Sequence, residues 1–420
     1  MKQRIIGSYI KLKETNILSN FFNLSGIQIS NILLLLLTIR IITGIVGIAE
    51  FGIIMWVNRF AQFIGSMINY GTNQSAVRDV AGNLNNKKEL NSVFCNTIWI
   101  RTLIFVLFLV VLPGLHAFNV PYYSYIILAI PIVLAEVFNP LSFYIGFEKL
   151  RVFNLVNLVF NVIAVGALLI FIKGRADAGW VNFILGAGNV VTYLGLLIYL
   201  GAKNKLPFRL PLKNELLKIG KGNLYLTINN ISGIVQQSFI LFALAKWSNI
   251  NVLGAYSICD RVIGQCRSLL IIISNAIYPN AVHIYKKSTD LWNAYRKKAK
   301  YLLAGLWFIA AIFIFIFADL IIFILTKEHN ETAVLFLRIM AFVPVVSSFN
   351  VLNILDQLLK NNMVSIFRIA VILVVIAPLT AFILLNSGNT PLIGAFTLIV
   401  ETSSCLMFEY VVKKSAVQNA

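Results

Sequence analysis

The sequence predicts an all-α polytopic membrane protein with about twelve transmembrane helices arranged in two six-helix lobes. Its 420 residues are 59% hydrophobic and only 12% charged, whereas soluble domains carry about 25% charged residues. Apolar stretches of about 20 residues, enough to cross a hydrocarbon core of about 30 Å, recur between short polar loops. Two short motifs also repeat about 200 residues apart in the same order, which indicates an internal duplication.

The first six apolar stretches define an N-lobe, residues 1–205. A basic start (Lys2, Arg4, Lys11 and Lys13) leads into an apolar run that is too long for a signal-peptide core, so we expect an uncleaved first span. The predicted spans are 17–39, 46–70, 93–115, 121–146, 152–172 and 178–201.

A polar stretch with Pro207 and Pro211 reads as a linker, after which residues 206–420 form the C-lobe. Its predicted spans are 221–245, 252–277, 299–325, 332–357, 362–385 and 390–412.

The halves share short motifs. Ser25-Gly26-Ile27 recurs as Ser232-Gly233-Ile234, and Gly52 with Asn58-Arg59 recurs as Gly254 with Asp260-Arg261. Many transporters contain two such repeats in the same orientation, related by an axis along the membrane normal. We therefore expect a duplicated six-helix unit.

The excess of basic residues, a formal net charge of +19, is explained by membrane topology rather than by nucleic-acid binding. Lys and Arg gather in the loops after even-numbered spans, for example Lys87 and Lys88, and Lys286 and Lys287. Cytoplasmic loops retain Lys and Arg, so both termini are predicted to be cytoplasmic.

The sequence contains no motif for a catalytic site. GxxxxGK[ST], GxSxG and HExxH motifs are all absent. The four Cys form no CxxC pair and the three His have no ligand-like spacing, so we predict no metal, no cofactor and no enzymatic activity.

Polar side chains gather on single faces of several predicted spans, which lipid therefore cannot cover. A charged residue at mid-bilayer costs about 2.5 to 3.5 kcal/mol and normally faces a cavity or a partner. Arg267 shares a helix face with Asp260, two turns away. Inter-lobe ion pairing and contact with substrate remain equally open roles. The candidate substrate-binding residues are Arg59, Gln62, Asn69, Asn230, Gln237, Asp260, Arg261 and Arg267.

Other polar residues receive more ordinary interpretations. Asn154, Asn157 and Asn161 in span 152–172 are predicted to hydrogen-bond between helices. Arg101 is predicted to snorkel or lie at the membrane interface. Glu136 and Asp319 are weaker candidates for ion coupling.

A family resemblance is carried by two segments of the first two spans, and part of it repeats in the eighth span. The segments are Leu37-Thr38-Ile39-Arg40 through Gly47-Ile48-Ala49-Glu50-Phe51-Gly52, and Tyr70-Gly71-Thr72-Asn73-Gln74. Over nearly its whole length the chain resembles flippases of the multidrug/oligosaccharidyl-lipid/polysaccharide exporter superfamily, in the O-antigen and capsule branch of polysaccharide biosynthesis proteins.

The resemblance implies a multi-pass flippase of the bacterial cytoplasmic (inner) membrane that needs no ATP. It would move undecaprenyl-pyrophosphate-linked oligosaccharide repeat units to the periplasmic leaflet by alternating access, for O-antigen, capsule or exopolysaccharide biosynthesis. Arg59, Arg261 and Arg267 would attract the pyrophosphate. It would be surrounded by membrane lipids. Its protein partners would be a polysaccharide polymerase and a chain-length regulator. The alternatives are a cation-coupled drug exporter of the same superfamily and a membrane polysaccharide polymerase.

Overall fold

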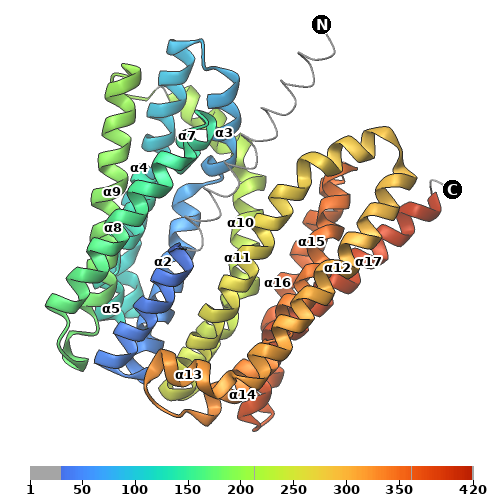
Figure 1. Ribbon diagram of the computed structural model, residues 1–420. Helices are drawn as coiled ribbons and strands as arrows, with labels where there is room; N and C mark the ends of the chain where they lie inside the picture. Colours follow the sequence, from blue (N-terminus) through green and yellow to red (C-terminus); the bar gives the residue numbers. More distant parts are fainter. Residues whose placement is uncertain (1–29, 212, 361, 419–420) are drawn as a thin grey trace, which may run out of the picture.

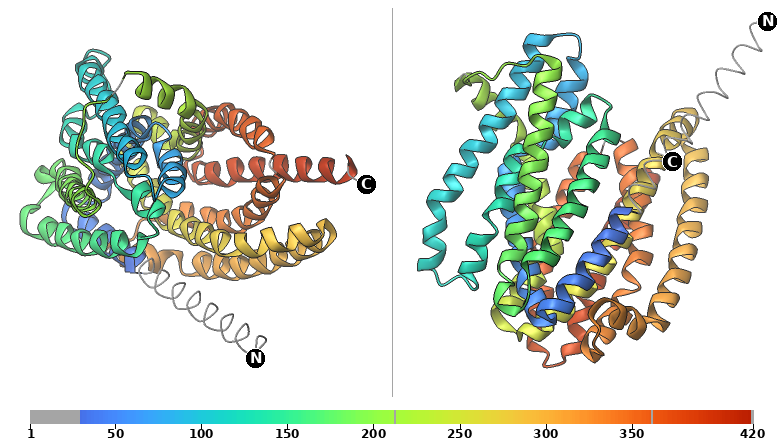
Figure 2. Two further views of the ribbon diagram at one scale, coloured as in Figure 1. Left: turned by 90° about the horizontal axis from the view of Figure 1, so that it is seen from above. Right: turned by 60° about the vertical axis from the view of Figure 1, so that its left-hand side comes forward.

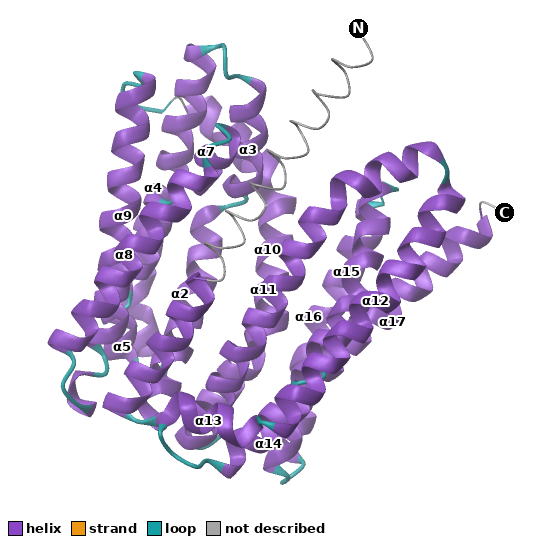
Figure 3. Ribbon diagram, in the orientation of Figure 1, coloured by secondary structure: helices purple, strands orange, loops and turns teal. Residues whose placement is uncertain are grey.

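The computed structural model describes residues 30–211, 213–360 and 362–418. Over these residues the regular structure is entirely helical, and no β-strand occurs (Figure 3). A helix satisfies every backbone hydrogen bond within its own segment, which hydrocarbon requires of a single spanning segment. The all-α prediction is confirmed.

The first half contains the helix Ser30–Val46 and eight further α-helices with one 3-10 turn. These are α2 (Ile48–Asn69), α3 (Thr72–Gly82), α4 (Lys87–Ala117), α5 (Tyr123–Leu128), α6 (Ile130–Phe138), α7 (Leu141–Gly146), α8 (Leu150–Phe171), η1 (Arg175–Asp177) and α9 (Trp180–Asn204).

The fourth predicted span, 121–146, consists of α5, α6 and α7 rather than one helix. Proline has no N–H to donate and clashes with the preceding turn. Pro131 lies in the first turn of α6, and Asn139-Pro140 separates α6 from α7. The break frees backbone carbonyls that need other donors.

Several helices of the second half are long and extend past the predicted spans at the ends that carry basic residues. Lys286 and Lys287 lie in the last turn of α11, and the Ser288 side chain then caps α12 by accepting hydrogen bonds from Asp290 N and Leu291 N. The elements are α10 (Lys213–Trp247), α11 (Ile250–Lys287), α12 (Thr289–Ile316), α13 (Ala318–Thr326), α14 (Glu331–Met340), α15 (Val343–Leu359), α16 (Met363–Asn386), η2 (Thr390–Ala395) and α17 (Phe396–Gln418).

Ten helical segments of the described chain are long and apolar enough to cross a membrane. The described part of the first predicted span, Ser30–Val46, is a shorter apolar helix, and the eighth predicted span lies within α11. Large apolar side chains point outward, with Val110 of α4 and Ile309 of α12 72% and 71% exposed. Such a surface is suited to lipid rather than to water.

The helices form two lobes that lie together at the lower edge of Figure 1, near α13 and α14, and diverge toward the upper edge, where α3 lies. Figure 2 shows the two groups of helices from above and from the side. At the lower edge α2 and α11 cross in backbone contact, because a Cβ on Gly52 would lie only 2.5 Å from Gly254 N. Two glycines thus make the close contact between lobes possible.

Helix α10 contacts both lobes. Toward its start, Asn223 Nδ2 donates to Ser75 Oγ of α3 at 2.9 Å and Gln74 Nε2 donates to Asn230 Oδ1 at 3.1 Å. Farther along, Gln236 Nε2 donates to the Ala370 carbonyl of α16 at 2.9 Å. The division of the chain at residues 205 and 206 therefore stays a proposal.

Candidate functional site

The center of the lobe contact is a pair of reciprocal hydrogen-bonded contacts between α2 and α11. Arg59 Nη2 lies 2.7 Å from Asp260 Oδ2. In the other direction, Arg261 Nη2 donates to Asn58 Oδ1, also at 2.7 Å. Each lobe contributes one arginine and one acceptor, so the two contacts are related by exchange of the lobes.

This reciprocity follows from the motif repeat in the sequence. Asn58-Arg59 and Asp260-Arg261 recur at matching positions of the two halves, as do Gly52 and Gly254, which meet about two turns away. When two copies of a helix pack about a two-fold axis, residue i of one contacts residue j of the other and vice versa. Such a reciprocal contact is what the proposed duplication would produce.

The two contacts differ in charge, because one acceptor is a carboxylate and the other an amide. Arg59 forms an ion pair and also donates to Gln62 Oε1 at 3.2 Å. Arg261 has no carboxylate within 4.0 Å among the described residues, and its Nε donates to Met55 Sδ at 3.1 Å. The contact as a whole carries a surplus of one positive charge.

Arg261 lines a cavity of about 440 Å³ in the N-lobe. This volume falls in the range of small-molecule sites, about 300 to 1,000 Å³. The polar residues around the cavity come from helix Ser30–Val46 and from α2, α6, α8, α9 and α11: Asn31, Thr38, Asn58, Gln62, Glu136, Asn157, Asn161, Asn189, Tyr193, Arg261 and Gln265.

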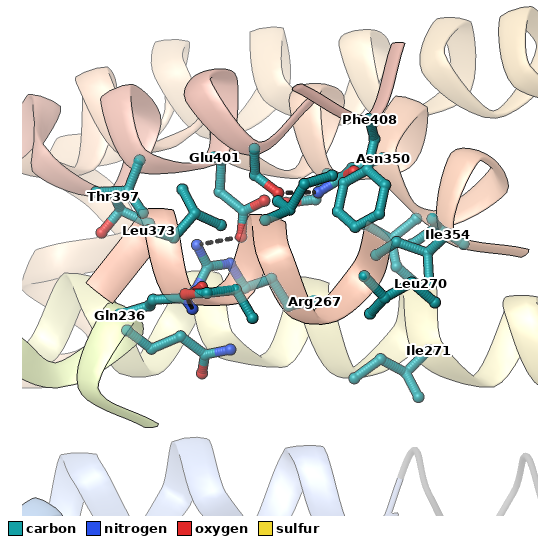
Figure 4. A pocket seen from close by; sticks show the side chains of 18 of the residues that line it. Gln236, Arg267, Leu270, Ile271, Asn350, Ile354, Leu373, Thr397, Glu401 and Phe408 are labelled. Atoms are coloured by element: carbon teal, nitrogen blue, oxygen red, sulfur yellow. Dashed lines mark hydrogen bonds and ion pairs between the residues drawn. The ribbon is translucent and has the colours of Figure 1, made fainter. Parts of the chain in front are cut away.

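A second cavity, of about 290 Å³, lies in the C-lobe and is more apolar. In Figure 4, Arg267 of α11 and Glu401 of α17 point toward each other across it; their Nη2 and Oε1 atoms are 2.9 Å apart. Asn350 Nδ2 donates to Ser404 Oγ at 2.8 Å nearby. Gln237 also lines this cavity.

A third cavity, of about 410 Å³, lies between the lobes and contains Gln62, Asn69, Asn230 and Glu136 among its lining residues. Gln62 and Glu136 also line the N-lobe cavity, so these two side chains lie between the two spaces.

The structure places the predicted site residues at the lobe contact and in two cavities, rather than in one site. Arg59, Gln62, Asp260 and Arg261 meet at the lobe contact, Asn69 and Asn230 line the inter-lobe cavity, and Gln237 and Arg267 line the C-lobe cavity. Although Asp260 and Arg267 share a helix, they have different partners, Arg59 and Glu401. The role of each residue in binding remains a prediction.

Arg101 does not snorkel outward from its helix as the sequence suggested, because its side chain is buried in the protein and only 1% exposed. Its guanidinium donates to Thr72 Oγ1 at 2.8 Å, to Asn73 Oδ1 at 3.1 Å, and to the Asn139 and Glu136 carbonyls at 2.7 and 3.3 Å. The Glu136 carbonyl lacks a helical donor because residue 140 is proline. Arg101 thus joins α3 and α4 to the break between α6 and α7.

The interpretation of Asn157 and Asn161 as interhelical hydrogen-bonding residues is wrong. Neither side chain makes a hydrogen bond within the described part of the chain, and Asn157 Oδ1 is buried without a partner. Both line the N-lobe cavity instead. Asp319, a weaker ion-coupling candidate, is largely exposed and lies 3.1 Å from His329 Nδ1. Across the described ranges, no group of three or more His, Cys, Asp or Glu side chains could hold a metal ion.

Comparisons with known proteins agree with this architecture. Residues 17–285, more than half of the chain, match the model of a family described as "Polysaccharide biosynthesis protein". A protein of Escherichia coli K12 named "Putative O-antigen transporter" is 23% identical over 267 residues, which are 62% of this chain and 63% of that protein. The match therefore spans less than two thirds of that relative's length.

Two solved structures share the fold at low sequence identity. An inward-facing multidrug resistance MATE family transporter of the MOP superfamily superposes with a TM-score of 0.76, at 14% identity, covering 92% of this chain and 95% of the other. The lipid II flippase MurJ, in an inward closed conformation, gives a TM-score of 0.70 at 13% identity, covering 92% and 87%.

Proposed function

The chain belongs to the polysaccharide biosynthesis protein family, and from this premise we propose that it translocates undecaprenyl-pyrophosphate-linked oligosaccharide repeat units across the bacterial cytoplasmic membrane. The movement would occur by alternating access, toward the periplasmic leaflet, for O-antigen, capsule or exopolysaccharide synthesis. The proteins it resembles are transporters and flippases, not enzymes.

The observation that carries the proposal is the arginine without an acidic partner at the lobe contact. An ionized side chain within a membrane is expensive unless it is paired or faces a functional cavity. Arg261 faces a cavity and has only neutral acceptors in the described chain. A guanidinium binds phosphate oxygens in a bidentate manner, so a pyrophosphate is a suitable ligand for this position.

The direction in which the lobes diverge supports entry of substrate from the cytoplasm. If the basic loops are cytoplasmic, the contact of Gly52 with Gly254 closes the periplasmic side and the lobes diverge toward the cytoplasmic side (Figure 1). In this inward-facing arrangement the headgroup would enter between the lobes while the polyprenyl chain stays in the bilayer. A polymerase and a chain-length regulator would then act on the translocated unit.

A cation-coupled drug exporter is the second candidate, because a MATE family transporter shares the fold. A site for cationic drugs would be expected to carry a surplus of negative charge. Here the lobe contact has two arginines and one carboxylate, which favors an anionic ligand instead.

Deletion of the gene in its host tests the function directly. We expect lipid-linked repeat units to accumulate in the cytoplasmic leaflet, out of reach of a periplasm-restricted glycan probe but present in whole-cell lipid extracts, with loss of surface polymer. Detection of unpolymerized single repeat units in the periplasm would refute the flippase proposal.

Point variants test the binding residues. Arg59→Ala and Arg267→Ala should each reduce surface glycan without reducing the amount of membrane-inserted protein. Normal glycan in both variants would remove these two arginines from the proposed site.

A further inference from the structure

The N-lobe cavity has an unusual lining for a membrane protein, because amide side chains from three separate helices face the same space. Asn157 and Asn161 come from α8, Asn189 from α9 and Asn31 from the helix Ser30–Val46. In the described chain none of these four amides forms a hydrogen bond to another side chain or to the backbone. They are therefore not interhelical contacts.

Two of these amides have carbonyl oxygens that are buried and unpaired. Asn31 Oδ1 and Asn157 Oδ1 have no hydrogen-bond partner in the described part of the protein. A buried polar atom without a partner costs about 1 to 3 kcal/mol. Several such groups around one cavity indicate a ligand, or ordered water in its absence, that pairs with them.

The chemistry of the lining defines the ligand. An amide side chain offers both a carbonyl acceptor and an NH2 donor, and a sugar hydroxyl likewise both donates and accepts. A purely apolar ligand would leave the amides unpaired, and an anion, which only accepts, would leave their carbonyl oxygens unpaired. A polyhydroxylated group is therefore the ligand that satisfies this cavity.

The described lining of the cavity has two charged side chains, and they come from different helices, α11 and α6. Among the described lining residues only Arg261 and Glu136 are charged. Glu136 accepts a hydrogen bond from Asn139 Nδ2 at 3.1 Å and forms no ion pair within 4.0 Å in the described chain. Arg101 donates to the backbone carbonyl of Glu136, not to its carboxylate. A Cβ on residue 65 would lie 2.8 Å from Glu136 Cγ, so Gly65 makes room for this side chain against α2.

A carboxylate in the cavity has a consequence for selectivity. In its ionized form Glu136 accepts hydrogen bonds from hydroxyl or acetamido N–H groups, whereas a sugar carboxylate or sugar phosphate would face a like charge in a low-dielectric space. Arg261, at the α11 side of the same cavity, is the residue assigned above to the pyrophosphate.

We propose that the N-lobe cavity is the binding subsite for the sugar that is linked to the pyrophosphate, and that Glu136 selects a neutral or N-acetylated sugar over a uronic acid. The inference rests on the proposed function, because Arg261 positions this sugar through the pyrophosphate. Asn157, Asn161 and Asn189 bind its hydroxyl groups.

The test is a binding measurement by native mass spectrometry on the full-length protein in lipid nanodiscs. Three probes are compared: undecaprenyl pyrophosphate alone, the same lipid bearing one N-acetylhexosamine, and the same lipid bearing one hexuronic acid. Wild-type protein should bind the N-acetylhexosamine lipid roughly tenfold more tightly than the bare lipid, as one to two net hydrogen bonds would give. The hexuronic acid lipid should lack this gain.

Substitutions separate the cavity from the rest of the molecule. Asn157→Leu and, independently, Asn161→Leu should lose most of the gain from the N-acetylhexosamine while binding bare undecaprenyl pyrophosphate normally. Asn154→Leu is the matched control, since Asn154 lies on the same helix but outside the cavity lining, and it should keep the gain. Glu136→Gln should raise the affinity for the hexuronic acid lipid.

Each outcome bears on one claim. Equal binding of bare and sugar-bearing lipid by wild-type protein, or an equal loss in the Asn154→Leu control, overturns the subsite and leaves the proposed flippase function intact. Tight binding of the hexuronic acid lipid by wild-type protein overturns selection by Glu136. Binding of none of the three lipids by folded protein overturns the proposed function together with the subsite.

Discussion

The substitution Asn58→Asp tests the assignment of Arg261 to the pyrophosphate by a change of one functional group. Asn58 Oδ1 lies 2.7 Å from Arg261 Nη2, so an aspartate at this position forms an ion pair at the same distance. The lobe contact then holds two arginines and two carboxylates, and its surplus of one positive charge disappears. The variant gains a competitor for the ligand without changing the size of the side chain.

The expected effect follows from the energy of a charged hydrogen bond. Hydrogen bonds that involve charged groups are worth about 1.5 to 3 kcal/mol net. If a pyrophosphate must displace such a contact, its affinity should fall by roughly 10- to 150-fold. The loss of affinity should exceed that caused by a neutral substitution of Asn58, because the aspartate neutralizes Arg261 while leaving it in place.

The assay is binding of undecaprenyl pyrophosphate to purified protein in nanodiscs at fixed salt, accompanied by thermal unfolding. The unfolding measurement matters because Asn58 Nδ2 also lies 3.4 Å from Asn182 Oδ1, a contact that aspartate cannot make. The opposite variant, Asp260→Asn, removes the carboxylate beside Arg59 and should bind more tightly than wild type. Equal affinities for Asn58→Asp and wild type, with both proteins folded, would refute the role of Arg261.

Three further expectations concern the lobe contact, the buried arginine and the C-lobe ion pair. Gly52→Ala should abolish transport, measured as surface glycan, because the added Cβ would clash with the Gly254 backbone. The control Gly166→Ala should transport normally, because a Cβ there has no neighboring atom within 4 Å. Arg101→Leu should lower the midpoint of thermal unfolding in detergent and reduce the free energy of unfolding by at least about 3 kcal/mol, since it leaves several buried acceptors unpaired. An unchanged midpoint would contradict this. Arg267→Glu and Glu401→Arg should each impair transport, because each places two like charges side by side. If the pair only stabilizes the lobe, the double variant with both substitutions should transport again. No recovery in the double variant would point to contact of Arg267 with the ligand.

The spans were predictable because the bilayer imposes a length and a polarity on each of them. Helix α3 was not predicted, since its sequence Thr72–Gly82 is polar and short. The break in the fourth span could have been inferred from Pro131 and Asn139-Pro140, but an apolar window averages over such residues. Proline positions were the missed signal.

The charged residues show where sequence reasoning ends. Helical periodicity places Asp260 and Arg267 on one face of α11, yet it cannot tell which neighboring helix supplies the partner of each. The motif repeat identified Arg59 and Arg261 as equivalent, and only the packing of α2 on α11 shows that each reaches the other lobe. Arg101 looked like an interface residue because its partners, including backbone carbonyls freed by a proline, are distant in sequence.

If the motif repeat reflects a duplication, as we propose, the exchanged contacts of Arg59 and Arg261 have an evolutionary meaning. Two identical subunits that met through this surface would have made the same contact twice, with the same acceptor in both places. Fusion of the two copies into one chain allows each acceptor to change alone. Asparagine and aspartate differ by one atom type at nearly constant shape, so a single such change suffices to leave one arginine neutralized and its counterpart available. A symmetric homodimer cannot acquire that difference, because one substitution changes both contacts at once.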